Sequence, residues 1–179
     1  MSKYETPRLI LRDVNLDDAV LVEEYASDNQ LAKTTLNIPS PYPEGSAKGF
    51  LAHAIDSQKA GKLLTLAVVL KETNALIGLM SIGINNNFQR GELGYWIGRP
   101  FWGKGYGTEA AGKILELGFT EFKLNKIFAQ AFATNPGSYR IMEKIGLKQE
   151  GILKEHVYRF NQFHDLIVYG MTARDFKGD

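Results

Sequence analysis

The stretch ELGYWIGRPFWGKGYGTEA, from Glu92 to Ala110, joins a strand pattern to a helix pattern through a glycine-rich turn. Gly103, Gly105 and Gly107 stand at alternate positions, and good helix formers follow them. Glycine loses more backbone freedom on folding than any other residue, so three of them before a helix require a reason. One reason is a flexible turn, which is common before helices. The other is a loop whose bare amides approach an anion at the positive end of a helix.

Two well-known phosphate-binding patterns do not fit this loop. The phosphate loop of NTPases ends in Gly-Lys-Ser/Thr, whereas Lys104 is followed by Gly105. The dinucleotide fingerprint needs a third glycine where Thr108 stands, and it belongs to an initial β-α-β unit that this chain lacks. What remains is a strand, a turn and a helix. In that geometry the amides of residues 104–108 can point together at one pyrophosphate, and Lys104 can add a positive charge.

Hydrophobic periodicity along the rest of the chain predicts one mixed α/β domain over residues 1–179. Predicted strands cover 8–13, 63–71, 76–85, 92–98, 125–133, 147–160 and 163–172. Predicted helices end near Ala26 after a cap at Asn15 or Asp17, and cover 46–59, 107–122 and 136–145, the last ending at Gly146. The helix residues expected to face inward are Leu21, Val22, Tyr25, Phe50, Leu51, Ala54, Ile55, Ala111, Leu115, Phe119 and Phe122. Hairpins are expected around 72–75 and around the Asn-Gln pair at 161–162, and the proline-rich segment 37–45 is expected to be a loop.

Composition and charge exclude several classes of protein. The 179 residues carry 21 basic and 20 acidic side chains, for a net charge of +1, which does not match the basic footprint of a nucleic-acid binder. No cysteine is present, and the three histidines show no metal-ligand spacing, so neither a disulfide scaffold nor a metal site is predicted. No membrane-spanning run and no signal-peptide core is seen. The simplest expectation is a cytoplasmic protein that binds neither nucleic acid nor membrane.

Four segments, taken in order, resemble the GNAT superfamily of acyl-CoA-dependent N-acyltransferases. The likeness is closest to its RimJ/RimL branch, which is named for ribosomal-protein N-terminal acetyltransferases. The segments cover nearly the whole chain: TPRLILR, ELGYWIGRPFWGKGYGTEA, NPGSYRIMEKIGLKQEG and YRFNQFHDLIVYGM. The resemblance implies a mostly antiparallel twisted sheet flanked by helices, with a V-shaped split between the fourth and fifth strands. It also implies acetyl-CoA as the acyl donor, no metal, and direct acetyl transfer to a primary amine in a ternary complex.

The resemblance further implies which residues bind the donor. The pantetheine arm would pair with the strand at Trp96, Ile97 and Gly98, and would receive a hydrogen bond from Asn135, although Asn135 and Ser138 also suit helix capping. The pyrophosphate would meet the loop formed by Trp102, Gly103, Lys104, Gly105, Tyr106, Gly107 and Thr108. Two positions depart from the broad superfamily: Trp102 replaces a usual Gln or Arg, and Met142 replaces a frequent tyrosine acid. In the RimJ/RimL branch a serine at the position of Ser138 is the candidate acid instead.

Acetyl transfer requires the amine to lose a proton, because an α-amino group has a pKa of roughly 8 and a lysine about 10.4. Glu92, acting through one or two waters, is the best candidate base, although it also suits an exposed strand edge. Some relatives carry a glutamate at the position of Val157, and Glu155, two residues earlier, would share its face. The base is therefore Glu92, Glu155 or water alone. A backbone N–H near Trp96 or Ile97 would meet the oxyanion, and Ser138 would hydrogen-bond the departing thiolate.

The sequence leaves the acceptor open between a protein N-terminus and a small-molecule amine. Transfer of another acyl group, and a non-catalytic CoA-binding module, are the alternatives. His164 and Asp165 match the branch pattern and are candidates for shaping the acceptor pocket, or for a simple hairpin hydrogen bond. Five aromatic residues are candidates for lining a cleft, although aromatic residues are more often part of the core: Tyr42, Tyr95, Trp96, Tyr158 and Phe160. The sequence does not decide the oligomeric state, and the aromatic residues of the closing hairpin would suit a homodimer interface.

Overall fold

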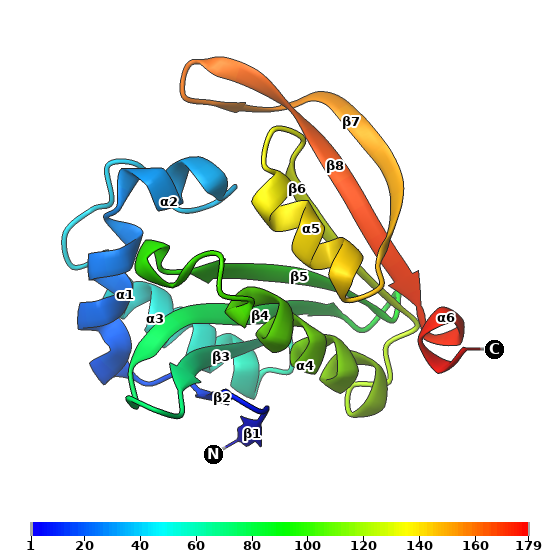
Figure 1. Cartoon of the computed structure of the whole chain (residues 1–179), viewed down its shortest axis with the longest axis horizontal. Helices are drawn as coiled ribbons and strands as arrows, with labels where there is room; N and C mark the ends of the chain where they lie inside the picture. Colours follow the sequence, from blue (N-terminus) through cyan, green and yellow to red (C-terminus); the bar gives the residue numbers. More distant parts are fainter. Residues whose placement is uncertain (1, 179) are drawn as a thin grey trace.

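The computed structural model describes residues 2–178, which form one eight-stranded sheet with helices on both faces (Figure 1). The spatial strand order is β1-β2-β3-β4-β5-β6-β8-β7, and only β5 and β6 run parallel to each other. The strands are β1 (Lys3–Glu5), β2 (Leu9–Asp13), β3 (Leu63–Leu70), β4 (Leu76–Asn85), β5 (Arg90–Ile97), β6 (Lys126–Phe132), β7 (Lys148–Arg159) and β8 (Gln162–Thr172). The helices are α1 (Ala19–Ala26), α2 (Asn29–Thr34), α3 (Ser46–Lys59), α4 (Tyr106–Thr120), α5 (Pro136–Lys144) and α6 (Ala173–Lys177), with short 3-10 turns at Leu16–Asp18 and Arg99–Phe101. The predicted mixed, mostly antiparallel fold is confirmed.

The sheet opens between β5 and β6. These strands pair only where Arg90–Leu93 lies beside Lys126–Ala129. Beyond that point β5 stays on β4 as far as Ile97, while β6 stays on β8 as far as Phe132. The two halves of the sheet therefore diverge, and this is the predicted split. Helix α4 makes the crossover that two parallel neighbours require, and α5 follows β6 along the opening (Figure 1).

Two apolar cores fix the helices to the sheet. Strand β3 is buried over nearly its whole length, because helices cover the sheet on both faces. One core joins the α4 and α5 side to the sheet, and its members include Leu66, Val68, Ile82, Ile114, Ile127 and Met142. The other joins α1 and α3 to the opposite face, and its members include Val22, Leu51, Ala54, Ala67 and Leu79. Alternate residues of a strand thus serve different cores, as the pleat requires.

Most element boundaries agree with the predictions. Asn15 caps the 3-10 turn that leads into α1. Helix α3 spans the predicted residues, and α5 begins at the Asn135 cap and ends before Gly146 at φ 95°. Both predicted hairpins form, but the closing turn lies at Phe160 and Asn161, which both have positive φ, rather than at Asn-Gln.

The differences concern short elements and helix faces. Strand β1, helix α2 and helix α6 were not predicted, because three to six residues carry too little periodicity to detect. Three residues expected to face inward are exposed instead: Leu21, Phe50 and Phe122. Phe122 lies beyond the end of α4, which stops at Thr120.

Candidate active site

Two residues of the glycine-rich loop have a backbone conformation that favours glycine. Gly103 has φ 74° and Gly105, which is the N-cap of α4, has φ 79°. A Cβ on Gly105 would also lie 3.3 Å from Nη2 of Arg8. Gly107 has a different reason, since its Cβ would lie 2.8 Å from Cδ1 of Ile141 on α5. Two glycines therefore shape the turn, and the third lets α4 and α5 approach each other.

Arg8, just before β2, holds this loop from outside. Its Nη1 donates to the carbonyl of Lys104 at 2.9 Å, and its Nε donates to Glu109 Oε2 at 2.7 Å. Glu109 Oε1 also accepts from the Arg8 backbone N–H at 2.8 Å and from the Thr6 hydroxyl at 2.6 Å. Burial would raise the pKa of Glu109, but these hydrogen bonds lower it on balance. In a trans peptide C=O and N–H point in opposite directions, so a carbonyl held towards Arg8 turns the amide of Gly105 away from it.

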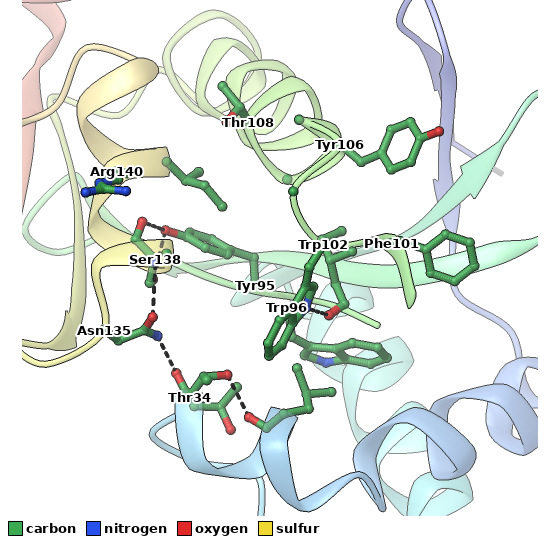
Figure 2. A pocket seen from close by; sticks show the side chains of 18 of the residues that line it. Thr34, Tyr95, Trp96, Phe101, Trp102, Tyr106, Thr108, Asn135, Ser138 and Arg140 are labelled. Atoms are coloured by element: carbon green, nitrogen blue, oxygen red, sulfur yellow. Dashed lines mark hydrogen bonds between the residues drawn. The ribbon is translucent and has the colours of Figure 1, made fainter. Parts of the chain in front are cut away.

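The backbone groups of β5 alternate between β4 and the split. The N–H of Gly98 donates to a β4 carbonyl at 2.7 Å, and such positions recur at every second residue. Trp96 therefore also faces β4, whereas the N–H groups of Tyr95 and Ile97 face the split, where β6 no longer pairs. The carbonyl of Ile97 accepts from the indole Nε1 of Trp102 at 2.6 Å (Figure 2). Of the two positions predicted for an oxyanion donor, only Ile97 has its amide in the split.

The start of α5 connects three elements. Asn135 Oδ1 caps the helix by accepting from the Ser138 N–H at 3.3 Å, and its Nδ2 donates to the carbonyl of Thr34 at 3.0 Å. From β5, the Tyr95 hydroxyl donates to the Ser138 carbonyl at 2.9 Å and lies 3.2 Å from Ser138 Oγ (Figure 2). Burial raises the pKa of Tyr95 to about 12, although its hydrogen bond to Ser138 acts in the opposite direction. The phenol therefore keeps its proton throughout the neutral range.

A cavity of about 430 Å³ lies between the glycine-rich loop, β5 and α5. Its lining includes ten of the residues predicted to bind the donor: Trp96, Ile97, Trp102, Gly103, Gly105, Tyr106, Gly107, Thr108, Asn135 and Ser138. Gly98 and Lys104 do not line it. A Cβ on Gly98 would meet the Tyr25 ring at 3.0 Å, and Lys104 Nζ lies 5.8 Å from the centre of the Phe101 ring.

Two cationic residues of this cavity were missed by sequence reasoning. Both line it from α5, where the four-residue spacing of Arg140 and Lys144 puts them on one helix face. Figure 2 shows Arg140 on this helix. That spacing was a usable signal. Bare amides at a helix N-terminus, a mostly apolar trough and two cations together fit a coenzyme A thioester, which carries phosphates at one end and a slender arm at the other.

A second cavity, of about 520 Å³, lies on the α1 and α3 side of the sheet. Residues 34–39 and Tyr42 line it, and the sheet contributes Thr65, Ser81, Glu92, Gly94 and Gln130. Glu92 is the single charged side chain of this lining among residues 2–178. The Glu92 side chain is exposed at the open cavity, yet partial desolvation by the surrounding residues raises its pKa. Arg90 lowers that pKa by a smaller amount.

The two cavities meet at residues that both linings share: Thr34, Thr35, Tyr95, Trp96 and Ser138. A family model described as an acetyltransferase (GNAT) domain matches residues 8–148. This chain belongs to the GNAT acetyltransferase family. It is accordingly an acyl-CoA-dependent N-acetyltransferase, which transfers the acetyl group of acetyl-CoA to an amine.

Comparisons with single proteins agree with this assignment. The N-acetyltransferase p20 of Bacillus licheniformis, described as uncharacterized, is 30% identical over 99% of this chain and 100% of its own. The alanine N-acetyltransferase of ribosomal protein uS5 from Escherichia coli is 24% identical over 97% of this chain and 92% of its own. The crystal structure of a GNAT-family acetyltransferase from Bacillus anthracis superposes with a TM-score of 0.85, at 29% identity over 97% of this chain and 99% of that chain.

In this GNAT acetyltransferase the closing hairpin contributes no described residue to either cavity lining. The expectation that Glu155 shares a face with Val157 is wrong, because a bulge between Leu153 and Val157 gives Glu155 a φ of 47° and leaves it exposed. Its backbone N–H instead donates to Asp165 at 2.8 Å. Of the two predicted carboxylate bases, only Glu92 reaches a cavity.

The other hairpin residues have structural contacts. His164 Nε2 lies 3.0 Å from the Arg159 carbonyl, so the hairpin hydrogen bond is the observed role. Tyr158 and Phe160 are exposed, whereas the three other aromatics proposed for the cleft do line a cavity. The guanidinium of Arg159 donates to the carbonyls of Leu36 and, at 2.6 Å, of Ile38, and thereby attaches the hairpin to the segment that covers the second cavity. In the part of the chain that the structure describes, no group of acidic, histidine or cysteine residues could hold a metal ion, and no helix could span a membrane.

Proposed function

We propose that this acetyltransferase acts on the α-amino group of a peptide or protein. The observation that carries the proposal is the charge of the second cavity, where Glu92 is the single charged side chain of the described lining. The N-terminal residue of a peptide brings one positive charge and no carboxylate, because its carboxyl group forms the first peptide bond. The relative from Escherichia coli that is named for the alanine of ribosomal protein uS5 supports the same acceptor class.

Other amines fit this cavity less well. A free amino acid would bring its carboxylate into a lining that offers no cation and already holds the carboxylate of Glu92, so the two negative charges would repel each other. A polyamine or an aminoglycoside would bring several cations to one carboxylate. A small monoamine matches the charge as well as a peptide does, and is the second candidate.

The donor would occupy the first cavity. The amides of residues 103–108 would receive the pyrophosphate at the N-terminus of α4. The pantetheine arm would follow β5, where Tyr95 and Ile97 direct their N–H groups into the split, and would reach Asn135. The thioester would then lie where the cavities meet, with the Ile97 N–H as the hydrogen-bond donor to the developing oxyanion.

Glu92 and Ser138 would handle the protons. Desolvation raises the pKa of Glu92 towards the working pH, which makes the carboxylate a better base for an amine proton carried by an intervening water. The neutral amine attacks the carbonyl carbon, a C–N bond forms, and the C–S bond breaks with its electron pair going to sulfur. Ser138 Oγ, which lines both cavities, would hydrogen-bond that sulfur.

A panel of acceptors tests this proposal. Release of CoA thiol would be followed with one peptide in two forms, with a free and with a blocked N-terminus, and each form would retain an internal lysine. Spermidine, a free amino acid and a simple monoamine complete the panel. Acetylation confined to the free-N-terminal peptide is expected, with mass spectrometry placing the group on the first residue. Acetylation of the internal lysine, or preference for spermidine, would contradict the proposal.

A further inference from the structure

A phenol reaches the start of α5 from the opposite wall of the split, because the Tyr95 hydroxyl of β5 donates to the Ser138 carbonyl (Figure 2). Tyr95 and Ser138 are both among the residues that line both cavities, so the pair stands where the thioester and the amine would meet.

The contact is specific to the oxygen atoms of Ser138. The Tyr95 hydroxyl lies 2.9 Å from the Ser138 carbonyl oxygen and 3.2 Å from Ser138 Oγ. Both acceptors belong to one residue, so a rotation about the phenolic C–O bond moves the Tyr95 proton from the carbonyl to the hydroxyl. An oxygen that receives a hydrogen bond becomes a better donor through its own hydrogen.

We propose that Tyr95 is a positioning residue for the departing thiolate, which orients and polarises the Ser138 hydroxyl so that two hydroxyls in series donate to sulfur. This inference rests on the proposed role of Ser138 as the group that hydrogen-bonds the CoA sulfur. A lone serine hydroxyl is a poor acid, and the phenol behind it, even with its pKa raised by burial to about 12, is the more acidic of the two hydroxyls.

The step balances within the reaction. As the C–N bond forms and the C–S bond breaks, sulfur takes the electron pair and receives the Ser138 hydroxyl proton. The Tyr95 proton moves to Ser138 Oγ, and water in the open cavity returns a proton to the tyrosine. The amine gives up one proton to Glu92 and then to solvent. Overall, one proton leaves nitrogen and one reaches sulfur.

The test is a mutant cycle measured in single turnovers of acetyl transfer from acetyl-CoA. Tyr95→Phe, Ser138→Ala and the double variant remove the two hydroxyls separately and together. Tyr139→Phe is the matched control, because Tyr139 directly follows Ser138 on α5, stacks on Tyr169 and lines neither cavity. Tyr95→Phe is expected to lower the rate about tenfold or more while acetyl-CoA affinity stays within about twofold. The double variant should be no slower than the slower single variant by more than about twofold, since both act on one donor.

A solvent isotope measurement separates a proton chain from a structural contact. The single-turnover rate in mixtures of H₂O and D₂O should depend on deuterium fraction along a curve in wild type, and the curvature should be weaker in Tyr95→Phe, because one of the protons in motion is lost. A Tyr95→Phe rate within twofold of wild type, equal curvature in both proteins, or effects that multiply in the double variant would overturn the inference.

The two proposals fail in different ways. Thiolate departure is common to every acceptor, so each variant would be measured with hydroxylamine as well as with the peptide. If hydroxylamine reacts and the peptide does not, the proposed acceptor is wrong and the role of Tyr95 is still measured. If Ser138→Ala keeps the wild-type rate, the roles of both hydroxyls are wrong. If only Tyr95→Phe keeps it, the positioning role alone is wrong.

Discussion

Replacing Arg8 with glutamine should weaken acetyl-CoA binding although Arg8 does not line either cavity. The substitution removes the hydrogen-bond donor to the Lys104 carbonyl and the ion pair with Glu109. The side chain of Arg8 is 48% exposed and that of Glu109 is 15% exposed. Screening limits such an ion pair to about 0.2–1 kcal/mol. The lost hydrogen bond adds about 1 kcal/mol. The free energy of unfolding should therefore fall by about 1–2 kcal/mol, with Tm lower by a few degrees.

The effect on binding follows from the freed peptide plane. Without Arg8 the Lys104–Gly105 peptide must be ordered when the pyrophosphate binds, which costs about 1 kcal/mol, or about fivefold in Kd for acetyl-CoA. Calorimetric titration at a temperature where both proteins are folded measures this change. Lys113→Gln is the matched control, because it removes one positive charge from an ion pair on α4 that does not touch the loop. If Arg8→Gln binds acetyl-CoA as wild type does, or if Lys113→Gln weakens binding equally, the Arg8 contacts do not preorganise the loop.

Three further substitutions test other parts of the site. Gly105→Glu puts a side chain at φ 79° and a negative charge on the loop, so acetyl-CoA binding should be lost in a variant whose circular dichroism is unchanged; retained binding would place the pyrophosphate elsewhere. Glu92→Gln should lower kcat/KM about a hundredfold at neutral pH. Because desolvation raises the pKa of Glu92, wild-type kcat/KM should fall as pH drops through that raised value, and this acid limb should vanish in Glu92→Gln but persist if Glu92 is not the base. Arg159→Met should raise KM for the acceptor several-fold and leave acetyl-CoA affinity unchanged, because Arg159 holds the segment over the second cavity; equal loss of both would contradict that role.

Local patterns of sequence predicted the parts of this fold that depend on local physics. The strands β3 to β6, the Asn135 cap and the terminating Gly146 all follow from residue type and spacing, and the structure confirms each. The split was implied by family resemblance rather than by periodicity. Nothing in the alternation of β5 distinguishes Leu93, which still pairs with β6, from Tyr95, which does not.

The rest of the site depends on contacts between distant segments. Arg8 lies 96 residues from the carbonyl that it holds, and the Asn135 amide that reaches Thr34 spans 101 residues, so no local pattern reports either. The bulge that removes Glu155 from its expected face is likewise set by the pairing of β7 with β8. The prediction for Lys104 rested on residue type alone, and the structure places its ammonium near the Phe101 ring and outside the lining of the first cavity.

The geometry of β5 explains how one short strand can serve both ends of the reaction. Side chains three residues apart on a strand point to opposite faces, so Glu92 lies in the wall of the second cavity while the Tyr95 hydroxyl reaches α5. On the same strand, the backbone N–H of Ile97 points into the split. A base for the amine, a donor for the oxyanion and a phenol behind the thiolate donor would then come from six consecutive residues held on β4. A change that shifts the β4–β5 register by one residue would exchange these faces, and should therefore abolish acetyl transfer even where the fold survives.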